Sequence, residues 1–149
     1  MKRSFSPSLA SLSESGTLPP KAGSFIRILL VEDSDTDVLL FEHMLLEAKP
    51  LFSYEIASAP RLTEAFELIA NQFFDLIMLD LNLLDINGIM PVAALSAEAP
   101  DVPIVVYSGM MDARLKEKAL NSGARHYLVK GRESADSLVT LIEAILAER

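Results

Sequence analysis

Five short apolar runs alternate with five amphipathic stretches between residue 26 and the C-terminus, and this alternation limits the possible folds more than any other feature. The runs are rich in β-branched residues and are bounded by turn residues, which is typical of strands buried on both faces of a sheet. We predict strands over the following ranges: Ile26–Val31, Phe52–Ala57, Asp75–Leu79, Pro103–Tyr107 and Arg125–Val129.

The stretches between the runs repeat apolar residues every three or four positions, as helices with one buried face do. In the first stretch, Ser34 and Asp37 form a capping-box pattern, and Lys49–Pro50 ends the helix. Further helices are predicted after Pro60, over Ile89–Ala97, over residues 113–121 and over a C-terminal stretch that includes Leu138 and Ile145. The alternation predicts an α/β fold, and right-handed crossovers favour the flavodoxin-like doubly wound (βα)5 arrangement with a parallel sheet of order 2-1-3-4-5.

Residues 1–24 differ from the rest of the chain because Ser and Pro replace most of the apolar residues that a core requires. We therefore expect a flexible tail over residues 1–24 and one folded domain over residues 25–149. Lys2 and Arg3 precede the Ser-rich stretch, but Pro7 interrupts it, and no continuous apolar segment of a secretory signal follows. A transit peptide is the alternative that this composition leaves open.

The overall composition excludes several classes of protein. A formal net charge of −8 argues against direct nucleic-acid binding, which requires clustered positive charge. No apolar run approaches the roughly 18 residues that a membrane-spanning helix needs. The absence of Cys excludes disulfides, thiolate metal sites and cysteine nucleophiles. We expect a soluble, cytoplasmic protein that does not contact a membrane.

Polar residues stand at the carboxyl ends of four predicted strands. Glu32 and Asp33 follow the first strand, Asp80 the third, Ser108 the fourth and Lys130 the fifth. In a parallel sheet these ends share one edge, where ligands bind near the switch in strand order. Each residue alone is an ordinary loop residue, but the complete set predicts a site.

The residue types at this edge indicate a metal-assisted phosphate acceptor. Clustered carboxylates repel one another and so favour a divalent cation or raised pKa values. Oxygen ligands without His or Cys suit Mg²⁺, Mn²⁺ or Ca²⁺ better than zinc. A carboxylate beside such a metal can attack phosphorus and form an acyl phosphate. Lys130 would neutralise one phosphoryl oxygen, and the hydroxyl of Ser108 would donate to another.

Four segments, each at a strand end, occur in a fixed order: ILLVED (28–33), DLIMLDLNLLDING (75–88), VVYSG (105–109) and YLVKG (127–131). On these segments, residues 25–149 resemble the receiver domains of two-component response regulators, of the chemotaxis-regulator type. The resemblance implies that Asp80 accepts a phosphoryl group from a histidine kinase or a phosphotransfer protein. It also implies a signalling switch and not an enzyme, apart from autocatalytic phosphorylation and dephosphorylation.

The resemblance assigns roles to further residues. The implied ligands of Mg²⁺ (or Mn²⁺) are Asp33, Asp80 and the backbone carbonyl of Asn82, with Glu32 in support. Ser108 and Lys130 would hold the phosphoryl oxygens. Tyr127 would be the aromatic switch residue, which rotates inward when Ser108 moves. The alternative is that Tyr127 is a half-buried aromatic residue of an edge strand with no switch role.

The sequence departs from the family pattern at three positions. Leu84 stands where Pro is common, which predicts a less rigid loop after Asp80. Gly131 replaces a Pro that often follows a cis peptide, and a cis bond before a non-proline residue costs about 2.5–4 kcal/mol, so the geometry of Lys130–Gly131 stays open. Met110 offers no base to an attacking water, so we expect no fast hydrolysis of the phosphorylated form.

Basic residues are concentrated in one segment, 114–132: Arg114, Lys116, Lys118, Arg125, Lys130 and Arg132. This segment belongs to the helix 4–strand 5–helix 5 side, where receivers meet partners, so we expect a downstream protein partner there, or a homodimer. A merely solvated face is the alternative.

Three alternatives to a phosphorylated, stand-alone receiver remain. The chain ends at Arg149 directly after the last helix, which predicts no output domain, but a fragment of a larger regulator or hybrid kinase would end there too. A receiver-like scaffold would never be phosphorylated. A phosphohydrolase with an aspartyl-phosphate intermediate would need a second Asp at position 82, where the chain has Asn82.

Overall fold

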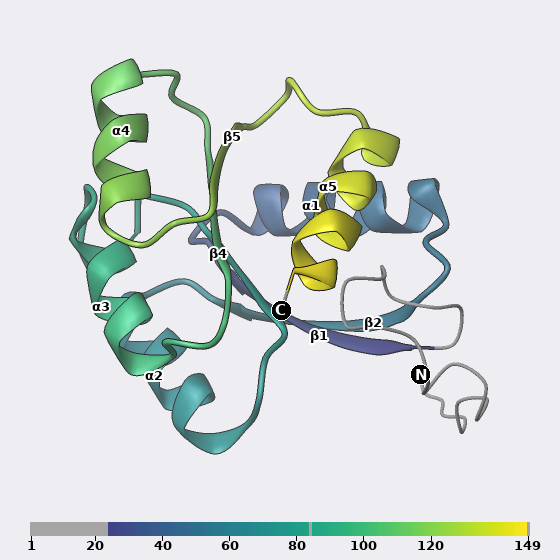
Figure 1. Ribbon diagram of the computed structural model, residues 1–149, viewed down its shortest axis with the longest axis horizontal. Helices are drawn as coiled ribbons and strands as arrows, with labels where there is room; N and C mark the ends of the chain where they lie inside the picture. The colour runs from purple at the N-terminus through teal and green to yellow at the C-terminus, as the bar shows by residue number, and fades with distance from the viewer. Residues whose placement is uncertain (1–23, 84, 149) are drawn as a thin grey trace.

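The computed structural model describes residues 24–83 and 85–148, in which five strands alternate with five helices (Figure 1). The strands are β1 (Phe25–Val31), β2 (Ser53–Ala59), β3 (Leu76–Leu79), β4 (Ile104–Ser108) and β5 (His126–Val129). The helices are α1 (Asp35–Ala48), α2 (Leu62–Asn71), α3 (Met90–Glu98), α4 (Ala113–Asn121) and α5 (Ala135–Ala147). The expected tail, except for Ser24, and the expectation for Leu84 fall outside the described residues.

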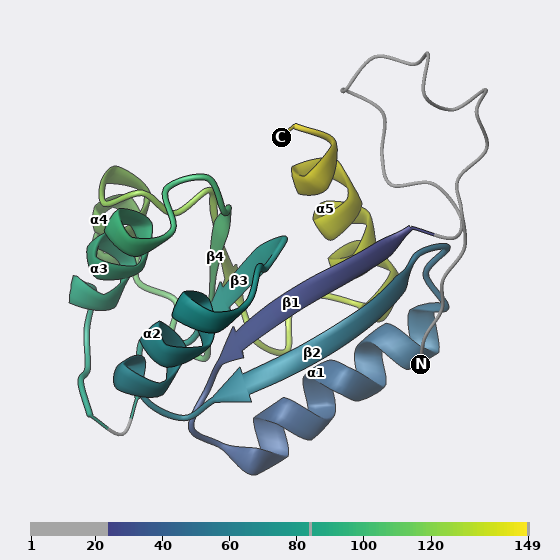
Figure 2. The same cartoon turned by 90° about the horizontal axis from the view of Figure 1, so that it is seen from below.

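All five strands are parallel and lie in the order β2-β1-β3-β4-β5, so the predicted doubly wound fold is confirmed. Figure 2 shows α1 and α5 on one face of the sheet and α2, α3 and α4 on the other. None of the helices in the described part of the chain is long and apolar enough to cross a bilayer.

The core has two layers because neighbouring residues of each strand point to opposite faces of the sheet. Leu30 belongs to the buried cluster that contains Phe41 and Leu45 of α1. Leu29, one residue earlier, belongs to the cluster beneath α2, together with Ala65. Helices cover both faces of the sheet, which explains why apolar residues run continuously along each strand and do not alternate with polar residues.

The predicted strand boundaries agree with the observed ones to within two residues. β2 continues to Ala59, two residues beyond the prediction, because Ser58 and Ala59 pair with Leu30 and Val31 of the adjacent β1. Ser108 is the last residue of β4 and does not follow it. Its pairing partner is Val129 at the end of β5.

Gly123, after α4, allows a close approach between α3 and the end of α4. Its φ is +124°, and a Cβ there would lie 2.8 Å from Ser96 Oγ. We expect Gly123→Ala to lower the free energy of unfolding by roughly 1–3 kcal/mol, because the alanine is strained and also displaces Ser96. Urea denaturation measures this loss. Gly109→Ala, where no atom lies within 4 Å of the added Cβ, is the control, and equal losses in the two variants would contradict the explanation.

Candidate functional site

A polar hollow of about 430 Å³ opens at the carboxyl ends of the central strands. The residues around it come from four strand ends and from the start of α1. Its charged lining residues are Glu32, Asp33, Asp37, Asp80 and Lys130. It lies at the switch in strand order between β1 and β3, where doubly wound sheets bind ligands.

The register of the sheet brings Glu32 and Asp80 together. Val31 of β1 pairs with Leu79 of β3, so the next residue of each strand enters the same space. The Asp80 amide donates to the Val31 carbonyl at 2.9 Å, and the Glu32 amide donates to the Ala59 carbonyl at 2.8 Å. Backbone hydrogen bonds therefore fix the positions of both residues independently of their side-chain contacts.

Three carboxylates form a compact acidic group at this edge. Oxygen atoms of Glu32, Asp33 and Asp80 all lie within 4.8 Å of one another. Glu32 and Asp80 are only 4% and 6% exposed, whereas Asp33 is half-buried. A donor set of carboxylate oxygens fits a hard divalent cation such as Mg²⁺, Mn²⁺ or Ca²⁺.

Lys130 contacts three carboxylates across the hollow. Its Nζ lies 2.5 Å from Glu32 Oε1, 2.8 Å from Asp37 Oδ2 and 3.2 Å from Asp80 Oδ2. Burial acts to lower the pKa of Lys130, but the hydrogen bonds to Asp37 and Glu32 and the charge of Asp80 outweigh it. The pKa of Lys130 therefore lies above its usual value, and the side chain is a permanent cation at physiological pH.

Burial raises the pKa of Glu32 from 4.5 to about 7, and the neighbouring Asp80 adds to the rise while Lys130 opposes it. A raised pKa means that the folded protein binds a proton more tightly than the unfolded chain, so stability falls as pH rises. Without divalent cations, we expect the free energy of unfolding to decrease by about 2–3 kcal/mol between pH 5 and pH 8.

Denaturation with urea at each pH, in the presence of EDTA, measures this decrease. In Glu32→Gln the side chain does not titrate, so we expect most of the decrease to disappear. An unchanged pH dependence in that variant would show that another group is responsible.

Ser108 and Tyr127 do not line the hollow. The buried Ser108 hydroxyl accepts a hydrogen bond from the Met110 amide at 3.4 Å, and it is the adjacent Gly109 that reaches the hollow. Tyr127 is 7% exposed and donates its hydroxyl proton to the Met110 carbonyl at 2.7 Å. Burial raises its pKa. The tyrosine expected to rotate inward thus already occupies a buried position in this structure.

The Lys130–Gly131 peptide is trans, since no peptide bond in the described residues is cis. Gly131 has a φ of +86°, a left-handed conformation that side-chain-bearing residues rarely adopt. The Lys130 amide donates to the Ser108 carbonyl at 2.8 Å. A glycine turn therefore directs the chain out of β5 in place of the cis peptide that the family pattern suggested.

The loop after Asp80 is held by its own hydrogen bonds and by one contact with α2. The Asn82 amide donates to Asp80 Oδ1 at 3.2 Å. The Asp85 carboxylate accepts from the amides of Leu62 at 3.0 Å and Thr63 at 3.3 Å, and these bonds lower its pKa. Arg61, the residue before α2, offers no side-chain cap, so Asp85 supplies one from a distant loop.

Two residues of this region were not predicted to take part in it. Asp37 was assigned to a capping box, and Ser34 Oγ does accept from its amide at 3.2 Å. The reciprocal bond is absent, because the Ser34 amide donates to Glu32 Oε2 and the Asp37 carboxylate turns to Lys130. Asp85 carried no signal in the sequence, since a cap supplied from 23 residues away has no local pattern.

A family model described as the response regulator receiver domain matches residues 28–143 of the chain. The chain belongs to this family. Among curated relatives, the transcriptional regulatory protein PrrA of Mycobacterium tuberculosis is 35% identical over 123 residues, which cover 83% of this chain and 51% of PrrA. The alginate biosynthesis regulator AlgB of Pseudomonas aeruginosa is 33% identical over 70% of this chain and 22% of its own length. The receiver domain thus spans about half or less of these relatives.

Solved structures agree with this assignment. A receiver domain protein of Methanospirillum hungatei, described as CheY-like, has a TM-score of 0.73 at 26% identity and covers 84% of this chain and 96% of its own. A response regulator of Burkholderia pseudomallei, solved with a phosphorylated aspartic acid and a calcium ion, has a TM-score of 0.69 at 24% identity. It covers 83% of this chain and 69% of its own, and it supports the fold alone.

Proposed function

We propose that this receiver domain is a phospho-accepting switch, in which Asp80 takes a phosphoryl group from a histidine kinase or a phosphotransfer protein. The observation that carries the proposal is the position of the Asp80 carboxylate. Its Oδ2 lies 3.2 Å from Lys130 Nζ, and it belongs to the acidic group that also contains Glu32 and Asp33. A buried carboxylate that has a permanent cation on one side, and on the other side carboxylates able to bind a metal ion, is suited to phosphoryl transfer.

The expected metal ion is Mg²⁺ or Mn²⁺. Asp33, Asp80 and the backbone carbonyl of Asn82 would hold it, with Glu32 in support. Such an ion supplies positive charge that offsets the charge on the phosphoryl oxygens. The donor set of this receiver domain fits it, because all the side-chain ligands offer hard oxygen atoms.

The transfer itself needs few groups of the protein. An oxygen of Asp80 forms a bond to phosphorus while the bond between phosphorus and the donor's histidine nitrogen breaks, and that nitrogen keeps the electron pair. Lys130 neutralises one phosphoryl oxygen. Asp80 becomes an acyl phosphate, and the donor's histidine leaves as neutral imidazole because its other ring nitrogen carries a proton taken from water.

The new phosphoryl group would act on the segment after β4. It offers the Ser108 hydroxyl proton a charged acceptor, and movement of Ser108 toward it would weaken the bond that Ser108 Oγ now accepts from the Met110 amide. Met110 also accepts from Tyr127, so a shift of this segment would reach the α4–β5–α5 face. The face would then have two arrangements, one before and one after this shift. Phosphorylation can change their populations only if the phosphoryl group interacts more favourably with one of them than with the other.

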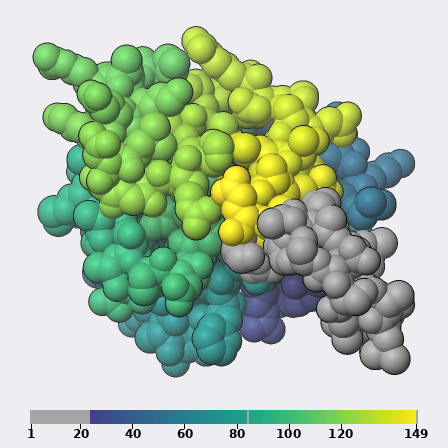
Figure 3. Space-filling view, in the orientation of Figure 1, coloured from purple at the N-terminus to yellow at the C-terminus, as the bar shows by residue number. Residues whose placement is uncertain are grey.

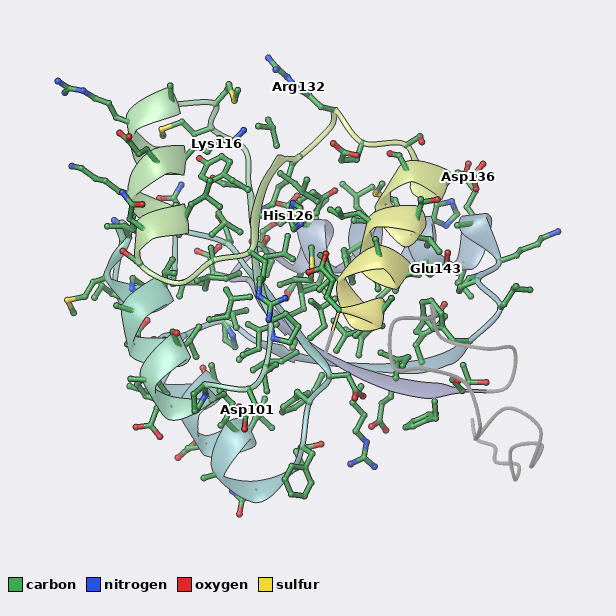
Figure 4. All side chains as sticks on the ribbon, in the orientation of Figure 1. Asp101, Lys116, His126, Arg132, Asp136 and Glu143 are labelled. Carbon is green, nitrogen blue, oxygen red and sulfur yellow. The ribbon has the colours of Figure 1, made fainter. Side chains whose placement is uncertain are left out.

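The α4–β5–α5 face is the surface that we propose for a downstream protein partner or a homodimer. Figure 3 shows α4, the segment after β5 and α5 side by side on one face of the molecule. Figure 4 shows Lys116 on α4 and Arg132 after β5 extending from this face, with Asp136 and Glu143 on α5. Both signs of charge are thus available to a partner, with the basic residues on the 114–132 side.

A second proposal concerns what the domain is part of. The segment that matches this chain covers only 51% of PrrA and 22% of AlgB, so both transcriptional regulatory proteins are longer than this chain. The same acceptor site would then serve as the receiver segment of a longer regulator, whose further domain carries the output. Comparison with the full native gene product distinguishes this from a stand-alone receiver.

The test is incubation of the purified protein with Mg²⁺ and acetyl phosphate, followed by intact-mass measurement and peptide mapping. We expect a stoichiometric phosphoryl adduct on the peptide that contains Asp80, and none when EDTA replaces Mg²⁺. No adduct under any condition would favour a scaffold that is never phosphorylated. Release of phosphate without accumulation of an adduct would favour a phosphohydrolase.

A further inference from the structure

Asp37 differs from the other two carboxylates that contact Lys130. It lies in the first turn of α1, whereas Glu32 and Asp80 directly follow strands. Its side chain is 34% exposed, compared with 2% for Glu32 and 8% for Asp80. It also lies outside the group of oxygens that are close enough to hold one metal ion. Asp37 can therefore pair with Lys130 without giving up a metal ligand.

The position of Asp37 is set by the backbone and not by Lys130. Ser34 Oγ accepts from the Asp37 amide, and the Val38 amide donates to the Ser34 carbonyl, which together fix the first turn of α1. No capping bond uses the Asp37 carboxylate, and its Oδ2 reaches the Lys130 ammonium at 2.8 Å. The carboxylate is thus presented to the hollow by a rigid helix end.

The two remaining partners of Lys130 are the ones that a metal ion would also bind. An oxygen lone pair of Asp80 that coordinates a metal ion cannot also fully accept a hydrogen bond from the Lys130 ammonium. The same holds for Glu32. Like charges within a few ångströms repel each other, so a bound divalent cation also pushes the ammonium away. Lys130 then needs another anion near the hollow, and Asp37 is in contact with it already.

We propose that Asp37 is a positioning residue of the acceptor site, which holds the Lys130 ammonium beside Asp80 while releasing Glu32 and Asp80 to a divalent cation. The inference rests on the proposed acceptor site and adds a residue that acts through Lys130. Without the Asp37 carboxylate, Lys130 would pair more tightly with Asp80 and Glu32. It would then compete with the cation for their oxygens and shield the oxygen that attacks phosphorus.

The experiment compares Asp37→Asn with Asp35→Asn by calorimetric titration of the full chain with Mg²⁺, without a phosphodonor. Both variants remove one charge from the first turn of α1, but Asp35 is exposed and does not line the hollow. We expect Asp37→Asn to weaken Mg²⁺ binding about tenfold and Asp35→Asn about twofold. Asp37→Glu, which restores a carboxylate, should recover most of the affinity, and this recovery excludes a general loss of folding.

The same titration in a Lys130→Met background tests whether Asp37 acts through Lys130. There the effect of Asp37→Asn should fall to about twofold, because no ammonium remains to be held. Equal effects in both backgrounds, equal effects of the Asp37 and Asp35 variants, or no Mg²⁺ binding by the unmodified protein would each overturn the inference. If Mg²⁺ binding follows the expected pattern but acetyl phosphate gives no adduct, the proposed phosphoryl transfer fails while the positioning role of Asp37 stands.

Discussion

Asp80→Asn should abolish the phosphoryl adduct that acetyl phosphate and Mg²⁺ form on the unmodified protein. The amide has no charged oxygen to attack phosphorus, and it is a weaker metal ligand than a carboxylate. Asp80 is 6% exposed and its position is fixed by the backbone bond to Val31, so no other carboxylate replaces it in the same place. We expect the adduct to decrease at least about a hundredfold, since the nucleophile itself is lost.

Intact-mass measurement at several times after addition of acetyl phosphate gives this result directly. Asp101→Asn is a matched control, because Asp101 is exposed and lies before β4, at the opposite ends of the strands from Asp80 (Figure 4). An adduct of normal amount in Asp80→Asn would mean that another residue is the acceptor. The assignment of Asp80 would then be rejected, although the fold would be unaffected.

Lys130→Met should destabilise the metal-free protein and strengthen its affinity for divalent cations. The variant leaves the buried carboxylates of Glu32 and Asp80 without their cation, and removing one partner of a largely buried ion pair costs about 3–5 kcal/mol. Lys130 is 19% exposed, so we expect the lower end of that range at pH 8. The loss should be smaller at pH 6, because the pKa of Glu32 is already about 7 and rises further without the lysine.

Urea denaturation at both values of pH, with and without Mg²⁺, measures these effects. We expect Mg²⁺ to restore more stability to Lys130→Met than to the unmodified protein, since the cation replaces the missing ammonium. Lys116→Met, on the exposed surface of α4, is the control. A Lys130→Met protein as stable as this control in EDTA would contradict the role that the three contacts assign to Lys130.

The parts of the fold that depend on local pattern were predictable from the sequence. Apolar runs such as Ile26–Val31 identified the strands, and handedness rules limited their order, which the structure confirms. The convergence of Glu32, Asp80 and Lys130 was predictable for the same reason, because parallel strands place their carboxyl ends at one edge. The roles of these residues in phosphoryl transfer stay predictions.

The side-chain pairings were not predictable, because they depend on contacts between distant segments. The carboxylate of Asp37 had two plausible partners, its own helix end and a lysine 93 residues away, and only the assembled hollow places the lysine within reach. The cap that Asp85 provides for α2 is of the same kind. Tyr127 was expected to rotate inward only when Ser108 moves, but in this structure its ring is already buried and its hydroxyl donates to the Met110 carbonyl.

The pairing of Val31 with Leu79 implies that the number of residues in β1 and β3 is as restricted as the types of residue in these strands. Deleting or inserting one residue within either strand would turn every following side chain toward the opposite layer. The carboxylate after that strand would then point into packed hydrocarbon, even though the composition of the chain had hardly changed. Length variation among natural homologues is therefore expected in the connections at the amino-terminal edge of the sheet, far from Asp80, and not within these two strands.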